Sequence, residues 1–233
     1  MDLRETISEI DEFLAMLSHE LRQPLAAALA AIEIQKTSPR QDRQEKARRV
    51  IEQQVRYIAR LVGDLSEVSR LSHGIVDLRR ERIDLRSVLR EALSMSEPLF
   101  DERKHQVSVA LGEDPLYVNG DVIRLKQVFS NLLKNAAAYT PPGGLIRVRA
   151  ELAPDGVHVS VADNGAGIPA DALERIFQLF QRGPVCTDQQ SAGIGLAVVR
   201  RLVGLHGGSV SAASDGPGCG AEFSVVLPAE FSS

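Results

Sequence analysis

The sequence predicts an α+β protein in two parts. A helical hairpin that pairs into a dimeric four-helix bundle comes first, and an α/β sandwich with a mixed sheet covered by helices follows. Apolar residues in the first 72 positions recur at alternating spacings of three and four, which is typical of long helices that pack along a seam. From residue 82 on, short strand patterns are interspersed with helical ones, which indicates a sheet layered against helices.

Two long helices account for the first part. The apolar seam of the first helix consists of Leu3, Ile7, Ile10, Leu14, Leu17, Leu21, Ala28 and Ile32. After a break at Thr37-Ser38-Pro39-Arg40, the second helix repeats the spacing at Ile51, Gln54, Ile58, Leu61, Leu65 and Val68. One hairpin buries only one stripe per helix, so two hairpins would pair in a homodimer. We expect residues 1–72 to form this dimerisation hairpin and residues 73–81 to form a linker.

Residues 82–230 are expected to form the second domain. The strand patterns are Arg82–Leu85, Gln106–Leu111, Leu145–Leu152, Val157–Ala162, Ser209–Ala213 and Glu222–Leu227. The helical patterns are Arg86–Phe100, Asp121–Tyr139 and Gly195–His206. Between Asn164 and Ala192 there is one short helical pattern, Asp171–Gln181. Such a long stretch inside a compact domain is typical of a lid or a binding loop.

Composition and charge limit the possible partners. The formal net charge of −4 supplies no basic field for nucleic acid or an anionic membrane. Cys186 and Cys219 have neither metal-ligand spacing nor a disulfide framework, so we expect free thiols in a reducing compartment. The longest apolar run, residues 24–32, is far shorter than the roughly 20 residues of a membrane span. We expect a cytoplasmic chain, and a sensor region outside these residues could attach the full-length protein to a membrane.

His19 is the first candidate for chemistry, because the seam places it at the outermost heptad position. An isolated exposed histidine is more often an ordinary surface residue. However, Pro24 removes the hydrogen bond to the carbonyl of Glu20, costs about 3 kcal/mol and would bend the helix just past His19. Such a bend would expose His19 as a nucleophile with Glu20 beside it as a base.

Three further groups of residues suggest a nucleotide site. Asn131 and Asn135 share one helix face and could ligate a magnesium ion, although such a pair taken alone is more often a polar stripe on a helix. Asp163 begins an Asp-Asn-Gly sequence that is common in hairpin turns, but no return strand follows it. Its carboxylate could accept the exocyclic amine of adenine. Gly193 and Gly195 open a helix whose backbone amides could approach phosphates.

Taken in order, these motifs make the whole chain resemble the core of a sensor histidine kinase. The matching segments are His19–Leu25 (phosphoacceptor box), Asn131–Tyr139 (asparagine box), Asp163–Gly167 (first glycine box), Ile176–Arg182 (phenylalanine box), Gly193–Leu196 (second glycine box) and Gly218–Phe223 (closing glycine motif).

The resemblance implies a Bergerat-type ATP-binding domain, a bound Mg²⁺ ion and a specific reaction. The γ-phosphoryl group of ATP would pass to His19, assisted by Glu20, and then to an aspartate of a response-regulator receiver domain. The nucleotide-binding residues that it implies are Asn131, Asn135, Tyr139, Asp163, Gly165, Gly167, Ile168, Arg182, Gly193, Gly195 and Leu196. Asn135 is the implied metal ligand.

The chain departs from the family pattern at three positions. Ala138 stands where many members have lysine, Ser191 where they have glycine, and Gln23 where they have threonine or asparagine. Two alternatives stay open. One is an ATP hydrolase of the same fold, which would use a glutamate at the position of Asn131. The other is a dimeric scaffold or pseudokinase that binds ATP with little or no transfer.

Overall fold

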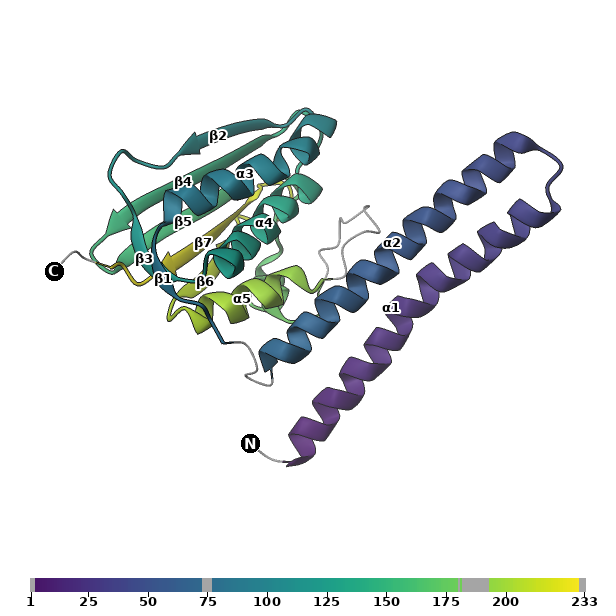
Figure 1. Cartoon of the computed structure of the whole chain (residues 1–233), viewed down its shortest axis with the longest axis horizontal. Helices are drawn as coiled ribbons and strands as arrows, with labels where there is room; N and C mark the ends of the chain where they lie inside the picture. Colours follow the sequence, from purple (N-terminus) through teal and green to yellow (C-terminus); the bar gives the residue numbers. More distant parts are fainter. Residues whose placement is uncertain (1–2, 73–76, 180, 182–192, 231–233) are drawn as a thin grey trace. The chain divides into compact units, whose positions relative to one another are not determined.

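The computed structural model describes residues 3–72, 77–179, 181 and 193–230. The chain divides into two compact units, Met1–Ser66 and Glu67–Ser233 (Figure 1). The predicted linker, residues 73–81, lies partly outside the described residues, and the predicted domain limits of 1–72 and 82–230 stay a prediction.

Two helices form the first unit, as predicted. α1 (Leu3–Thr37) and α2 (Gln41–Ser72) lie side by side around the short connection at residues 38–40, and α1 continues through Pro24 (Figure 1). The side chains buried in this hairpin are Pro24, Ala28, Ala31, Ala47, Gln54, Tyr57 and Leu61. On α2, Gln54 and Leu61 of the predicted seam are buried, whereas Ile51 and Ile58 are only half-buried and Tyr57 is buried in addition.

A five-stranded mixed sheet forms the centre of the second unit, as predicted. Its strands are β2 (Gln106–Ala110), β4 (Leu145–Ala153), β5 (Gly156–Asp163), β6 (Ser209–Ala213) and β7 (Ala221–Leu227). Their spatial order is β2-β4-β5-β7-β6. β2 pairs with β4 in parallel, and the remaining neighbours are antiparallel.

Three helices cover one face of this sheet: α3 (Leu85–Glu102), α4 (Val122–Tyr139) and α5 (Gly195–Leu205) (Figure 1). Alternation along β5 sets this arrangement, since Val157, Val159 and Val161 are buried while His158 and Ser160 are half-buried. The core formed in this way is aliphatic and includes Phe129 of α4 as its largest fully buried side chain.

A second, two-stranded sheet was not predicted in full. β1 (Glu81–Asp84) pairs antiparallel with β3 (Tyr117–Gly120). β1 corresponds to the expected strand, but the four residues of β3 are too few to show a strand period and end on the turn residues Asn119 and Gly120.

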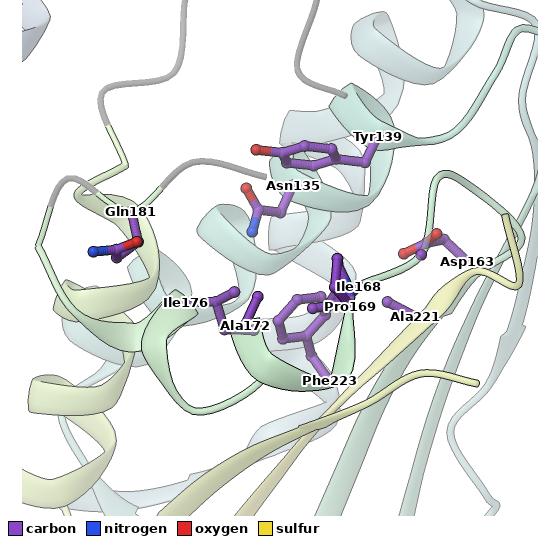
Figure 2. Close-up of a pocket in the computed structure, with 11 residues that line it drawn as sticks. Asn135, Tyr139, Asp163, Ile168, Pro169, Ala172, Ile176, Gln181, Ala221 and Phe223 are labelled. Carbon is purple, nitrogen blue, oxygen red and sulfur yellow. The ribbon is translucent and has the colours of Figure 1, made fainter. Parts of the chain in front are cut away.

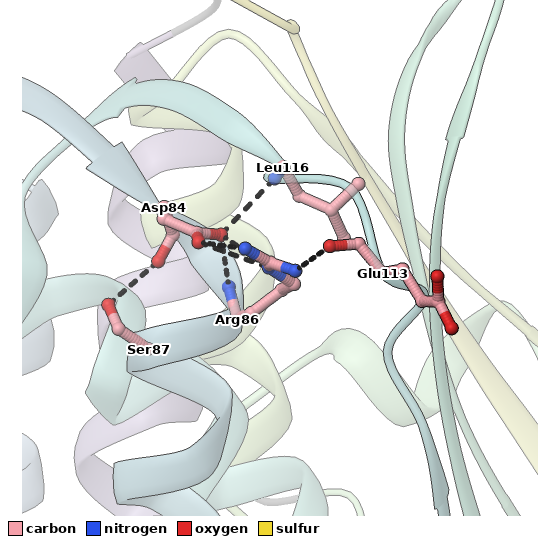
Figure 3. A network of polar contacts seen from close by, with 5 residues as sticks. All are labelled: Asp84, Arg86, Ser87, Glu113 and Leu116. Carbon is pink, nitrogen blue, oxygen red and sulfur yellow. Dashed lines mark hydrogen bonds and ion pairs between the residues drawn. The ribbon is translucent and has the colours of Figure 1, made fainter.

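A polar network fastens the loop between β2 and β3 to the start of α3 (Figure 3). The carboxylate of Asp84 accepts hydrogen bonds from the backbone N–H groups of Arg86 at 3.1 Å and of Leu116 at 3.2 Å. The Arg86 guanidinium binds this carboxylate, with Nη2 at 2.7 Å from Oδ2, and donates to the carbonyl of Glu113. The hydrogen bond from Arg86 lowers the pKa of Asp84, so the carboxylate is ionised and caps α3 at neutral pH.

The helix predicted over Asp171–Gln181 is wrong. The described part of this stretch contains two 3₁₀ turns, η1 (Ala170–Ala172) and η2 (Arg175–Phe177), and Gln178 after them is extended. Phe177 packs edge to face on Phe223 of β7, with ring centroids 6.4 Å apart, and this tertiary contact outweighs the helical period of the local sequence.

None of the helices in the described ranges has the length and apolarity that a bilayer span requires.

Candidate nucleotide site

Asp163 lies at the end of β5, between Ile146 of β4 and Ala221 of β7. Its side chain is buried, and its Oδ1 atom accepts the Gly165 N–H at 2.8 Å. Burial raises the pKa of Asp163, while hydrogen bonds from the backbone N–H groups of Gly165 and Ala221 oppose that rise. The site therefore presents an acidic acceptor in an apolar wall.

One cavity of about 70 Å³ brings five of the predicted site residues together (Figure 2). They are Asn135 and Tyr139 from α4, and Asp163, Gly167 and Ile168 from the end of β5 and the loop after it. Figure 2 shows the two α4 side chains facing the aliphatic and aromatic side chains of the opposite wall. The cavity thus combines apolar walls with one carboxylate, and a flat apolar ring that has a hydrogen-bonding edge would be complementary to it.

Sequence reasoning missed six residues that line the same cavity: Pro169, Ala172, Ile176, Gln181, Ala221 and Phe223. A signal for four of them was present, because Ile176 and Gln181 lie in the phenylalanine box, and Ala221 and Phe223 lie in the closing glycine motif. Which members of a motif face a ligand depends on the register between β5 and β7, and the motif alone does not give that register.

Two glycine-rich loops form the wall behind Asp163. A Cβ atom on Gly167 would lie 2.0 Å from the carbonyl oxygen of Gly216, and one on Gly220 would lie 2.1 Å from that of Asp163. Both glycines also have positive φ angles. A Cβ atom on Gly165 would lie 2.3 Å from the carbonyl oxygen of Tyr139. These glycines are therefore required for close backbone packing, which also explains why Gly165 supports the cavity without lining it.

The second glycine motif lies at the start of α5. Gly193 has a φ of +67°, Ile194 is buried, and the Nδ2 atom of Asn131 donates to the carbonyl of Gly195 at 3.3 Å. This contact joins the asparagine motif of α4 to the first turn of α5, where Leu196 is half-buried. Arg182 and Ser191 lie outside the described residues.

The phosphoacceptor segment lies within α1. The backbone of His19 is helical, but its side chain lies outside the described part of the structure. Glu20 is half-buried, and the buried Tyr57 of α2 donates from its hydroxyl to Glu20 Oε2 at 3.4 Å. Gln23, one of the departures from the family pattern, is exposed.

Comparisons with known proteins identify two family domains in this chain. A family model described as "Histidine kinase-, DNA gyrase B-, and HSP90-like ATPase" matches residues 120–230, and the "His Kinase A (phospho-acceptor) domain" matches residues 9–74. The probable sensor histidine kinase TcrY of Mycobacterium tuberculosis is 36% identical over 94% of this chain, which spans 46% of that protein. The chain thus has about half the length of this curated relative.

Two solved structures have a similar fold. Full-length ShkA in complex with AMPPNP has a TM-score of 0.70 and 30% identity, covering 95% of this chain and 46% of that one. Histidine kinase ThkA in complex with its response regulator TrrA has a TM-score of 0.78 and 24% identity, covering 97% of this chain and 64% of that one, and shows the fold alone.

The family match over residues 120–230 identifies an ATPase domain of the histidine kinase, gyrase B and HSP90 class. Because a phosphoacceptor domain precedes it in the same chain, the chain belongs to the sensor histidine kinases and comprises their catalytic core.

Proposed function

We propose that this chain binds Mg-ATP, phosphorylates His19 and passes the phosphoryl group to an aspartate of a response-regulator receiver domain in two-component signalling. The observation that carries the proposal is the presence of both matched domains in one chain. The phosphoacceptor match includes His19, and the ATPase match includes every residue that lines the cavity.

In the proposed complex the adenine ring occupies the cavity. Asp163 accepts the exocyclic amine, and its carboxylate repels the carbonyl oxygen that guanine has at the same place. Tyr139, Ile168 and Phe223 provide the apolar surface around the ring. The phosphates lie toward α5, because Ile194 gives no side-chain cap to this helix and leaves its first backbone N–H groups as donors.

The described residues fit a magnesium ion that is held mainly by the nucleotide. They include no group of three His, Cys, Asp or Glu side chains that could bind a metal without a ligand. Asn135 lines the cavity and would supply an amide oxygen, while Asn131 anchors Gly195 nearby. Bound magnesium would neutralise phosphate charge, and its usual coordination by waters and phosphate oxygens requires few protein ligands.

In the transfer step, an imidazole nitrogen of His19 bonds to the γ-phosphorus as the bond to the bridging oxygen of ADP breaks. Glu20 accepts the imidazole proton. The Tyr57 hydroxyl contacts the Glu20 carboxylate and therefore orients this base. Such a reaction depends mostly on positioning and charge stabilisation. A rival hydrolase would need a general base near the phosphates, and Asn131, which stands in the place of its glutamate, is not one.

We further propose that two chains form the active unit. In the single chain, α2 has a second apolar stripe at Ile51, Val55, Ile58, Val62 and Leu65. Val55 is 55% exposed and Val62 is 48% exposed. On α1, Leu25 and Leu29 are also exposed. A second hairpin would cover both stripes and complete a four-helix bundle.

The proposal is tested by incubating the purified chain with γ-labelled Mg-ATP. We expect label in an acid-labile bond on the parent and none on the His19→Gln variant, which should bind ATP within a few-fold of the parent. The labelled parent should lose its label to a receiver domain. Binding of ATP without any labelling would instead identify a scaffold, and labelling of His19→Gln would identify a different acceptor.

A further inference from the structure

Ser214 lies behind the cavity and is not among its lining residues. Its hydroxyl donates to the carbonyl of Gly220 at 2.6 Å and accepts the N–H of Ile168 at 3.0 Å. The Gly216 N–H also reaches it, at 3.2 Å. One small hydroxyl thus connects the loop that follows β5 with the loop that joins β6 to β7.

The loop after β5 carries the base-binding groups. It runs from Asp163 to Pro169, and Gly167, Ile168 and Pro169 line the cavity directly. The loop between β6 and β7 supports it from behind through two backbone hydrogen bonds. These run from Gly218 N–H to the Ala166 carbonyl at 2.6 Å and from Gly220 N–H to the Gly165 carbonyl at 3.1 Å.

Ser214 adds a hydrogen bond between the two loops at Ile168, where no backbone hydrogen bond joins them within the described residues. The Ile168 N–H lies beyond the last backbone bond between the loops and directly beside the cavity. Loss of the hydroxyl would leave this donor and the Gly220 carbonyl without their partner, which favours a shift of the loop. Because Asp163 is held in β5 by its pairing with β4 and β7, whereas Ile168 belongs to the loop, such a shift would change the width of the slot between the apolar wall and the carboxylate.

We propose that Ser214 is a positioning residue for the nucleotide base, which fixes the loop from Asp163 to Pro169 at the width that selects adenine. This inference rests on the proposed binding of ATP and extends it by naming a determinant of base selectivity that touches no ligand atom. Its effect passes through Ile168 and Gly220, so it acts on the base end of the nucleotide and leaves the phosphate end unchanged.

The test compares three variants by calorimetric titration with Mg-ATP and Mg-GTP. Ser214→Ala removes the hydroxyl, Ser214→Thr retains it, and Ser211→Ala removes an exposed serine of β6 as a matched control. We expect Ser214→Ala to weaken ATP binding about five- to tenfold and to reduce the ratio of ATP to GTP affinity. Ser214→Thr should restore both values, and Ser211→Ala should keep them.

Autophosphorylation kinetics provide the second readout. For Ser214→Ala, KM for ATP should rise while kcat at saturating ATP stays at the parental value, because the reacting end of the nucleotide is unaffected. An unchanged ATP affinity and ATP-to-GTP ratio in Ser214→Ala would overturn the inference. So would a fall in kcat and melting temperature without a change in KM. A parent chain that binds no ATP at all would instead refute the proposed function.

Discussion

At the scale of single residues, Asp163 is the residue that we propose to select the nucleotide base. Its carboxylate is buried and has acceptors alone, so in the proposed complex the Asp163→Asn change would place an amide NH₂ group opposite the adenine amine and remove a charge. A charge-assisted hydrogen bond is worth about 1.5 to 3 kcal/mol. We therefore predict at least a tenfold weaker ATP affinity, measured by calorimetry on the purified variant.

The control for this variant is Asp155→Asn, which changes an exposed carboxylate in the turn between β4 and β5, at the opposite end of β5. It should bind ATP like the parent. Parental affinity in Asp163→Asn, or equal affinity of the parent for GTP and ATP, would remove Asp163 from the recognition of the base.

At the scale of elements, His206 connects three segments of the catalytic unit. Its Nε2 accepts the Asp121 N–H at 3.0 Å, and its Nδ1 lies 2.7 Å from the Leu202 carbonyl at the end of α5. Asp121 caps α4 and also accepts the N–H of Arg79 at 2.9 Å, and the Arg80 guanidinium donates to the Leu205 carbonyl. The segment at residues 79–80 is thereby joined to the start of α4 and to the end of α5, two helices that contribute to the nucleotide site.

Burial lowers the pKa of His206 below its ordinary value of 6.5. The Leu202 carbonyl and Asp121 oppose this shift, and Arg80 adds to it. Above pH 6.5 the histidine is neutral in both the folded and unfolded chain. Below pH 6.5, His206 binds a proton in the unfolded chain but stays neutral in the folded chain. The free energy of unfolding therefore decreases as the pH is lowered, by up to about 1.4 kcal/mol per pH unit.

We predict that the melting temperature of the chain decreases when the pH is lowered from 7.5 to 5.5. The His206→Gln variant should have a lower melting temperature at pH 7.5, but its melting temperature should depend less on pH. His158→Gln, which changes a half-buried histidine on β5, should retain the parental dependence. A parental slope that persists in His206→Gln would show that another group titrates.

The elements themselves divide into those that the sequence predicts and those that it does not. The helices of the hairpin and the strands β4, β5 and β7 were predicted correctly. In each of them one face is buried, so apolar residues repeat at the helix or strand spacing over a long segment. The strand β3 and the two 3₁₀ turns were not, since four residues show no period and the packing of Phe177 on Phe223 is a tertiary contact. The same limit applies at the site, where motifs gave Asp163 and Tyr139 but not Pro169 or Ala172.

At the scale of the whole molecule, the exposed apolar stripe of α2 predicts the oligomeric state. We expect the parent to have twice the chain mass by light scattering after size-exclusion chromatography. The double variant Val55→Glu, Val62→Glu should have the mass of a single chain, because a dimer would bury four unpaired carboxylates. Arg56→Glu, a neighbouring exposed position, should remain dimeric. A monomeric parent at micromolar concentrations, or a dimeric double variant, would contradict the four-helix bundle.

The glycine contacts behind Asp163 also limit how this pocket can diverge in evolution. Any side chain at Gly167 or Gly220 would collide with a backbone carbonyl, so neither position can take another residue without displacing a loop. Ala221 and Phe223 carry side chains that line the cavity, and their volume can vary while the loops stay in place. Homologues can therefore acquire a different ligand preference by substitution of lining residues such as Ala221 and Phe223. The backbone conformation of the two loops has to stay the same, because it requires glycine at positions 167 and 220.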